Sequence, residues 1–235
     1  MSEVTYEGDN LEVLAQMPKY YSWIMETFAP YVSGHVVEYG AGAGTVSERL
    51  APLARELTLV EPSANLVPLL RARFAGDART EVIPEGLEAH SAGIAPETVD
   101  TVVMVNVLEH IEDDEAALKA LVRMTKRGGH LLIFVPALQF LLSRLDRNLG
   151  HFRRYHKPDL VEKVLGAGAE VRVCHYFDLP GVLPWLILNK FMGSTSFNPA
   201  LIDLNDRVVV PASRLLEKVV PLPFGKNLIL VARKP

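Results

Sequence analysis

The chain has 235 residues, enough for one large α/β domain with a well-buried core. Hydrophobic residues make up 49% and charged residues 22%, which is typical of a globular protein. The formal net charge of -4 at pH 7 argues against a protein that binds nucleic acid mainly through phosphate contacts, because such proteins are basic overall.

The cysteine content and the chain's apolar stretches bear on its location. Cys174 stands alone, so neither an internal disulfide nor a thiolate metal site is possible, and we expect no metal and a reducing, cytoplasmic location. The first residues are acidic and polar, unlike a secretory signal. The most apolar stretch, residues 179–191, contains Pro180 and Pro184 and is too short to span a bilayer. We therefore expect a soluble protein without stable membrane insertion.

Hydrophobic runs alternate with amphipathic segments in the first part of the chain, which is the pattern of a parallel sheet covered by helices. A helix is predicted first, over residues 11–31. Strands and helices then alternate: strand 35–39, helix 45–53, strand 56–60, a helix capped by Ser63 and running to residue 74, strands 80–83 and 99–105, helix 113–126 and strand 130–135. Gly128 and Gly129 are expected to stop the helix before the last of these strands.

The rhythm changes in the second part of the chain. A helix is predicted over residues 157–165 and a strand over 170–176, and residues 178–210 read as irregular because they are rich in Pro, Gly and Asn. The last strand, residues 227–232, follows a turn and is expected to pair antiparallel with its neighbour. The pattern predicts an α/β fold of the doubly wound kind. Its sheet is mostly parallel and seven-stranded, with helices on both faces and a final antiparallel strand.

A glycine-rich loop carries the strongest local signal. Residues 38–44 read EYGAGAG, directly after a predicted strand and before a predicted helix. Glycine permits a tight turn and lets the backbone approach a ligand, while the helix start offers unpaired N–H groups. A dinucleotide fingerprint that begins at Gly40 would need glycine or alanine where Thr45 stands, so the spacing departs from that motif.

The G-x-G-x-G loop with Glu38 two residues before it resembles the first motif of class I S-adenosylmethionine-dependent methyltransferases, of the small-molecule, type 11/12-like kind. The resemblance covers roughly residues 11–136 and implies a Rossmann-like methyltransferase fold. It also implies S-adenosyl-L-methionine as cofactor and S-adenosyl-L-homocysteine as product. In that family the acid orients the loop and the methionine ammonium. The loop residues expected at the cofactor are Gly40, Ala41, Gly42 and Gly44.

Two further segments, after the second and third predicted strands, are expected to contact the cofactor. Glu61 and Pro62 end the second strand about twenty residues after the loop, where a carboxylate can accept hydrogen bonds from ribose hydroxyls. A solvated glutamate at a strand end is the alternative. Glu85, Gly86 and Leu87 follow the third strand, where the family contacts adenine. Many members have Gly-Asp in that loop, so a simple turn is the alternative here.

The fourth segment follows the central strand. Asn106 and Val107 are expected near the sulfonium, and residues 107–111, VLEHI, resemble the fourth motif of small-molecule methyltransferases. His110 is a candidate for cofactor contact or catalysis, or it packs at a helix start. Tyr20 and Tyr21 lie on the first helix, which closes over the cofactor in related enzymes, and helix packing is the alternative for them.

The acceptor side is predicted from residues 145–155, LDRNLGHFRRY, which resemble a subgroup signature that does not name the acceptor. His151 is the preferred general base and Tyr155 the second candidate. Arg153 and Arg154 are candidates for binding an anionic acceptor. The alternative is a solvated basic loop with salt bridges to Asp146 or Asp159.

The sequence therefore predicts methyl transfer from S-adenosylmethionine to a small-molecule acceptor, apolar or anionic, by in-line displacement. We expect one domain over residues 1–235, with a helical cap over 1–34 and an inserted lid or cap over 178–213 that suits an apolar acceptor. The state is a monomer or homodimer without nucleic acid. Two alternatives stay open: a nucleotide-dependent oxidoreductase and a non-catalytic S-adenosylmethionine-binding partner protein.

Overall fold

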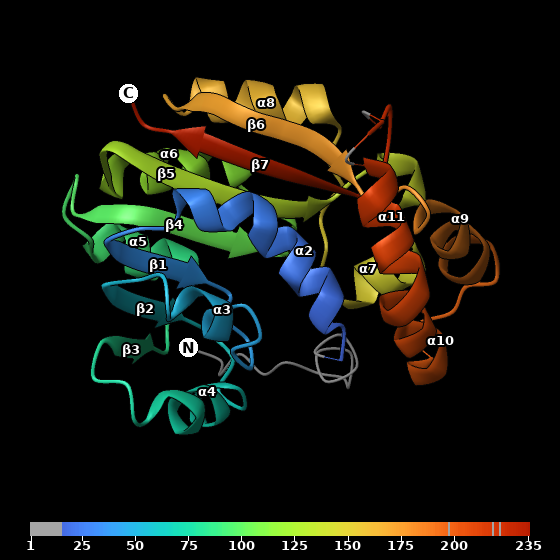
Figure 1. Ribbon diagram of the computed structural model, residues 1–235. Coiled ribbons are helices and arrows are strands. Elements are labelled where there is room, and N and C mark those ends of the chain that lie inside the picture. Colours follow the sequence, from blue (N-terminus) through green and yellow to red (C-terminus); the bar gives the residue numbers. More distant parts are fainter. Residues whose placement is uncertain (1–15, 197, 218, 221) are drawn as a thin grey trace.

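The computed structural model describes residues 16–196, 198–217, 219–220 and 222–235. These residues form a seven-stranded sheet in the order β3-β2-β1-β4-β5-β7-β6 (Figure 1). The strands are β1 His35–Tyr39, β2 Glu56–Val60, β3 Thr80–Ile83, β4 Val99–Val105, β5 Thr125–Pro136, β6 Glu170–Phe177 and β7 Asn227–Arg233. Strands β1 to β5 pair in parallel, and β7 lies antiparallel between β5 and β6. The predicted fold class is confirmed.

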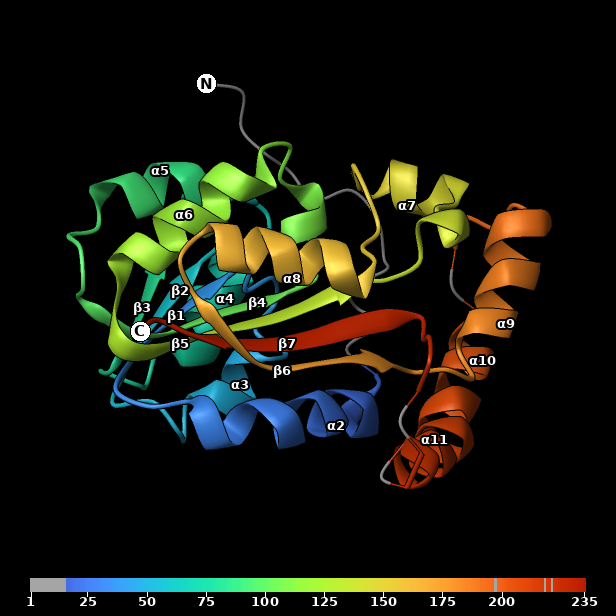
Figure 2. The same ribbon diagram turned by 90° about the horizontal axis from the view of Figure 1, so that it is seen from above.

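Helices cover both faces of the sheet (Figure 2). On one face lie α5 Leu87–Gly93, α6 Asp114–Met124 and α8 Lys157–Gly166, which share a buried apolar cluster with that side of the strands. On the other face lie α2 Pro18–Phe28, α3 Ser47–Leu50 and α4 Val67–Phe74. Strands β1 and β4 are neighbours although β2 and β3 intervene in the chain, so the connections diverge there and open a crevice at the carboxyl ends of the strands.

Several predicted boundaries were wrong, and the glycines are the clearest case. Helix α6 ends at Met124 and β5 begins at Thr125, so Gly128 and Gly129 lie inside the strand instead of stopping the helix. A Cβ on Gly129 would lie 2.6 Å from the carbonyl oxygen of Asp100, so glycine is needed for close strand packing.

Other helices differ from the prediction in length or in existence. Helix α3 is shorter than the predicted 45–53, and α4 starts at Val67 without a side-chain cap from Ser63. The predicted first helix is seen as α2 followed by η1 Ala29–Tyr31, while residues 11–15 of that prediction lie outside the described residues. Helix α5 was not predicted.

Residues 178–210 are largely helical, so the prediction of an irregular segment was wrong. The segment and its continuation form α9 Val182–Pro184, the π-helical η4 Trp185–Phe191, α10 Pro199–Leu204, the π-helical η5 Asn205–Val209 and α11 Val210–Glu217. Pro199 sits in the first turn of α10, where its missing N–H costs nothing, and Asn198 caps that helix by accepting from the N–H of Ala200. Figure 1 shows α9, α10 and α11 beyond the carboxyl ends of the parallel strands.

Three short helical turns complete the same edge: η2 Leu108–His110 after β4, then η3 Gln139–Leu141 and α7 Arg144–Asn148 after β5. Among the described residues, no helix is both long enough and apolar enough to cross a membrane.

Candidate active site

An open cavity of about 1230 Å³ lies at the carboxyl edge of the sheet, between the ends of β1, β2 and β4 and the helical segment that begins with α9. A single small-molecule pocket has a volume of roughly 300–1,000 Å³. The cavity therefore has room for a cofactor and for a second molecule.

Most of the residues predicted from sequence to bind the cofactor line this cavity. They are Tyr20, Tyr21, Glu38, Gly40, Ala41, Gly42, Glu61, Pro62, Glu85, Gly86, Leu87, Asn106, Val107 and His110. Of the residues predicted on the acceptor side, His151 and Arg154 also line the cavity, whereas Arg153 and Tyr155 do not. Gly44, which was predicted at the cofactor, does not line it either.

The structure explains the glycines at both ends of the loop, Gly40 and Gly44. Gly40 has φ +65°, and a Cβ there would lie 2.4 Å from Cγ2 of Val107 in the loop after β4. Its N–H donates to the carbonyl of Val60 at 2.8 Å. Gly44 has φ +91° and faces α4, where a Cβ would lie 3.0 Å from Cδ of Arg73. Gly44 therefore serves helix packing, and the cofactor contact predicted for it is not supported by its position.

Glu61 connects the end of β2 to the glycine loop. Its Oε2 accepts from the N–H of Gly42 at 2.8 Å, and its Oε1 accepts from the N–H of Ser63 at 2.9 Å. Each carboxylate oxygen has two lone pairs, so both oxygens keep accepting capacity. The predicted alternative of a solvated glutamate is wrong, because the side chain is 4% exposed.

Glu38 is buried beneath the loop. Its Oε2 accepts from Oγ of Ser47, at the start of α3, at 2.6 Å. Burial raises the pKa of Glu38 to about 8, Ser47 opposes that rise, and the nearby Glu61 adds to it. Because burial disfavours the ionised form, a cation placed in the cavity beside this carboxyl group would favour its ionisation.

The two N-terminal tyrosines differ in their surroundings. The hydroxyl oxygen of Tyr20 accepts from Nδ2 of Asn227 at 2.7 Å, and its ring packs edge-on against Phe134 and Phe177. Helix packing is thus a large part of what Tyr20 does. Tyr21 is half-buried, with the guanidinium of Arg49 at 5.6 Å from its ring centroid.

His151 is held by a buried carboxylate. Its Nδ1 lies 2.9 Å from Oδ1 of Asp146, and the same oxygen accepts from Nη2 of Arg154 at 2.8 Å. Oδ2 of Asp146 accepts from the N–H and the hydroxyl of Ser143, both at 2.7 Å, in a capping box at the start of α7. Although burial alone would raise the pKa of Asp146, the bonds from His151 and Arg154 hold it well below its usual range.

Glu109 and His110 lie on the far side of the His151 ring. Oε1 of Glu109 is 4.0 Å from Nε2 of His151, and the two imidazoles stack edge-on with ring centroids 4.6 Å apart. Burial, together with the neighbouring His151, lowers the pKa of His110 to about 4, and a hydrogen bond to the backbone of Leu149 opposes this shift. Burial raises the pKa of Glu109 to about 8.

The remaining acceptor-side predictions are corrected by burial. The Tyr155 hydroxyl donates to Oδ2 of Asp114 at 2.8 Å inside the core, away from the cavity, so Tyr155 is not positioned as a base. Arg153 pairs with the same Asp114 at 2.8 Å, and Arg154 is 4% exposed. The alternative prediction of a solvated basic loop is therefore wrong for Arg154, which is buried. The salt bridge to Asp146 that this alternative included is present.

Sequence reasoning missed Glu109 as a site residue and gave Asp146 only a surface role. The signal was present in the spacing of Asp146, His151 and Arg154, because an acid followed by two bases within nine residues permits a closed hydrogen-bonded group. Nothing in the sequence shows that these charges are buried.

The wall opposite the strands comes from the helical segment after β6. Its cavity-lining residues are mainly apolar and include Pro184, Trp185, Leu188, Met192, Leu201, Ile202 and Val209.

The chain is similar to known proteins along most of its length. The sequence profile of a family described as methyltransferase domain matches residues 37–133, which include the glycine loop, Glu61 and the loop after β4. The chain is a methyltransferase of the S-adenosylmethionine-dependent class. This match decides against the oxidoreductase alternative.

Ubiquinone biosynthesis O-methyltransferases of two bacteria are among its relatives. The enzyme of Xanthomonas euvesicatoria pv. vesicatoria is 25% identical over 69% of this chain and 72% of its own length. The enzyme of Ralstonia nicotianae is 27% identical over 68% of this chain and 73% of its own length. The solved structure of phosphoethanolamine N-methyltransferase 2 from Haemonchus contortus, in complex with S-adenosyl-L-methionine, matches with a TM-score of 0.63. Its identity is 15%, over 96% of this chain and 57% of that one. That likeness shows the fold.

Proposed function

We propose that this methyltransferase transfers a methyl group from S-adenosylmethionine to a hydroxyl group of an apolar small molecule. The observation that supports this most is the continuity of one cavity. The same cavity is lined by the glycine loop at one end, by His151 beside it and by the apolar residues of the helical segment opposite.

The residues at the strand ends fit the cofactor. The remaining lone pairs of Glu61 can accept from ribose hydroxyls, and the buried carboxyl group of Glu38 can pair with the methionine ammonium. Gly40 and Gly42 leave backbone exposed to the ligand, and residues 85–87 lie where adenine is expected. When bound, S-adenosylmethionine supplies a methyl group already activated on a sulfonium. The protein's task is therefore to align the acceptor and to exclude water.

An apolar acceptor fits the charges better than an anionic one. The guanidinium groups of Arg153 and Arg154 already pair with Asp114 and Asp146, so neither has an unpaired charge to offer an anion. Residues 178–213 then act as the lid over the apolar body of the acceptor, and α2 closes the cavity from the N-terminal side. Residues 1–15 of the proposed cap, 1–34, lie outside the described residues. Oxygen is the methylated atom in the two bacterial relatives, by their names.

His151 is the side chain that we place at the reacting hydroxyl. The ionised Asp146 can only accept, so Nδ1 of His151 carries the proton and Nε2 presents its lone pair on the side of Glu109. That lone pair either takes the hydroxyl proton or holds a cation that makes the hydroxyl more acidic. The proposed function requires only that His151 acts at the acceptor oxygen.

The cofactor assignment is tested by thermal unfolding with S-adenosylhomocysteine. Because a ligand of the native state stabilises it, we expect a rise in Tm with this compound and none with NAD. Glu61→Ala should weaken the rise, and Glu56→Ala, at the exposed start of the same strand, should leave it unchanged. An equal rise in both variants would remove the ribose role of Glu61.

The acceptor class is tested by turnover. Alkyl-substituted phenols of increasing chain length, matched amines and matched carboxylates are incubated with S-adenosylmethionine, and S-adenosylhomocysteine is measured. We expect phenols with apolar substituents to be methylated best. A preference for the amines or for the carboxylates would overturn the proposal.

A further inference from the structure

We propose that Glu109, His110 and His151 bind a divalent transition-metal ion. The binding of the ion is independent of the methyl transfer, whereas its role as activator of the acceptor hydroxyl rests on the proposed function. The sequence predicts no metal, because a single cysteine cannot build a thiolate site and the sequence does not show that His110 and His151 meet.

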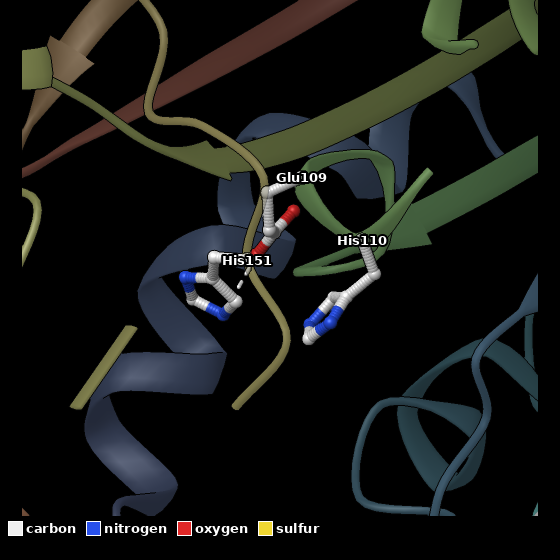
Figure 3. A group of neighbouring side chains, drawn as sticks. All are labelled: Glu109, His110 and His151. Carbon is white, nitrogen blue, oxygen red and sulfur yellow. Dashed lines mark ion pairs between the residues drawn. The ribbon is translucent and has the colours of Figure 1, made fainter. Parts of the chain in front are cut away.

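The geometry of the three side chains suits a shared ion. One potential ligand atom from each of them lies within 4.8 Å of the others, and Figure 3 shows the side chains converging from the loop after β4 and from the loop after α7. Bonds of about 2.0–2.2 Å in tetrahedral geometry separate ligand atoms by roughly 3.4 Å. Closing the group around an ion therefore requires side-chain movements of about 1 Å, within reach of rotamer adjustment.

The imidazole of His151 has its second nitrogen anchored in the way that metal ligands require. A metal-ligating histidine almost always donates its other N–H to a carboxylate or a backbone carbonyl. His151 does so to Asp146 through Nδ1 at 2.9 Å, which leaves its Nε2 on the side of Glu109. Asp146 is fixed in turn by Ser143 and Arg154, so the ring orientation is set by the folded protein before any ligand arrives.

The buried carboxylate of Glu109 is independent evidence for a bound metal ion. Glu109 is 0% exposed, and apart from a contact with its own backbone amide neither of its oxygens has a hydrogen-bond partner among the described residues. Arg154 does not serve it, because that guanidinium donates to Asp146 and to the carbonyl of Ala137. A buried carboxylate without a partner is costly, and buried charges are normally paired or coordinate a metal.

The ligand set selects the kind of ion. Two imidazole nitrogens and one carboxylate oxygen suit Zn²⁺, Co²⁺, Fe²⁺ or Mn²⁺, whereas Mg²⁺ prefers oxygen ligands only. His110 and His151 line the cavity and Glu109 lies behind them, so the fourth position of the ion faces the acceptor. This is the open arrangement of a catalytic site with three protein ligands.

In that position the ion binds the acceptor's hydroxyl oxygen and lowers its pKa. The proton leaves to solvent, and the oxygen lone pair forms the bond to the methyl carbon. The carbon–sulfur bond breaks with its electron pair going to sulfur, which leaves S-adenosylhomocysteine. His151 then acts as a ligand.

Metal binding is tested on the protein alone. Chelator-treated full-length chain is dialysed against Zn²⁺, and Co²⁺ is used in parallel for its visible absorption. We expect one ion per chain, with at least tenfold weaker binding in Glu109→Gln, His110→Ala and His151→Ala. His156→Ala is the control, because that histidine lies outside the cluster. No stoichiometric Zn²⁺ binding, or equal affinity in all four variants, would overturn the site and leave Glu109 as a neutral, protonated core residue.

The S-adenosylhomocysteine thermal shift, measured on every variant, separates the two proposals. A variant that retains the shift is folded, so its loss of Zn²⁺ binding reports on the cluster. If S-adenosylhomocysteine does not raise the Tm of the wild type, the proposed function is wrong, but the Zn²⁺ binding result still holds. Chelation should reduce turnover of the phenols, with recovery on adding Zn²⁺. Unchanged turnover in the chelated enzyme would overturn the activating role.

Discussion

Asp146 is the residue on which the acceptor side of the site depends. It accepts hydrogen bonds from Ser143, His151 and Arg154, and its side chain is fully buried. A carboxylate with several donors stays ionised, which fixes the tautomer of His151 and neutralises Arg154.

Asp146→Asn should destabilise the protein strongly, because it leaves the buried guanidinium of Arg154 without a counter-charge. Breaking one side of a buried pair costs about 3–5 kcal/mol, to be measured by urea unfolding at pH 7. Asp203→Asn is the matched control, since its ion pair with Arg207 is exposed and contributes at most about 0.5 kcal/mol. The folded-state pKa of Asp146 is depressed, so the stability that it provides is present above the unfolded pKa of about 3.9 and is lost as pH falls below it. A similar small loss in both variants would contradict the buried pair.

Glu38 makes the opposite pH prediction. Its pKa in the folded chain is about 8, above the ordinary glutamate pKa of 4.5 that applies to the unfolded chain. Between these two pH values the folded chain holds a proton that the unfolded chain has lost. This group therefore reduces stability as pH rises through that window. If the cofactor's ammonium pairs with Glu38, binding at pH 7 should release on the order of one proton.

Calorimetry of S-adenosylhomocysteine binding in buffers of different ionisation enthalpy measures that release. Glu38→Gln should abolish it, whereas Glu85→Gln, which changes an exposed carboxylate at the same cavity, should not. Identical proton release in Glu38→Gln would place the ammonium elsewhere.

At the scale of elements, local patterns predicted the strands well and the helix ends poorly. Strand β4 is central in the sheet, and its apolar run over residues 102–105 indicates that both faces are buried. Gly128 and Gly129 read as a helix stop, but both lie within β5, where Gly128 has φ +80° and Gly129 allows close packing against Asp100. Residues 178–210 read as irregular because Pro and Asn were taken as breakers, although Pro199 and Asn198 start a helix. Whether Gly, Pro or Asn ends a helix or begins one depends on where the residue lies relative to the turn.

The glycine loop gives the prediction at this scale. Gly40→Ala places a Cβ against Val107 in a backbone conformation with φ +65°, so both the loop after β4 and the loop itself must shift. We expect at least tenfold weaker binding of S-adenosylhomocysteine and a loss of stability of about 1–3 kcal/mol. Val107→Ala in the same chain should restore part of the affinity, because it removes the collision and leaves the strained φ. Gly76→Ala is the control, since a Cβ there meets nothing within 4 Å. Full affinity in Gly40→Ala would show that the loop does not hold the ligand.

For the whole molecule, the two halves of the site differ in how far sequence predicts them. The cofactor half follows from residues at strand ends, and parallel strands place their carboxyl ends together. The other half, around His151, depends on which charged groups fold inward, and only the tertiary structure brings Glu109 of η2 beside the group formed by Asp146 of α7 and Arg154 of the loop after it. The helical segment after β6 lines the cavity opposite both halves, and its attachment to α2 is equally invisible in the sequence.

Asp206, which is 3% exposed on η5, makes the buried part of that attachment, and an ion pair between Arg214 and Glu26 adds to it at the surface. Oδ1 of Asp206 accepts from the N–H of Tyr20 at 2.9 Å and its Oδ2 from the N–H of Lys19 at 3.2 Å. The N-cap residue of α2, Met17, makes no side-chain cap, so an aspartate far along the chain caps this helix. The cap joins two elements that line the cavity, and opening it should expose the cofactor.

Asp206→Ala should therefore cost about 1–2 kcal/mol, the usual effect of losing a helix cap. It should lower Tm by about 2–8 °C in a chain of this size. The dissociation rate of S-adenosylhomocysteine, followed by stopped flow, should rise several-fold, while the association rate changes little because the strand-end groups are intact. Asp206→Asn keeps an acceptor oxygen and should recover most of both effects, whereas Asp203→Ala, one turn away and exposed, should show neither. A lower Tm with an unchanged dissociation rate would mean that Asp206 stabilises α2 without closing the lid. In that case the segment from α9 to η5 would be a fixed wall of the acceptor cavity.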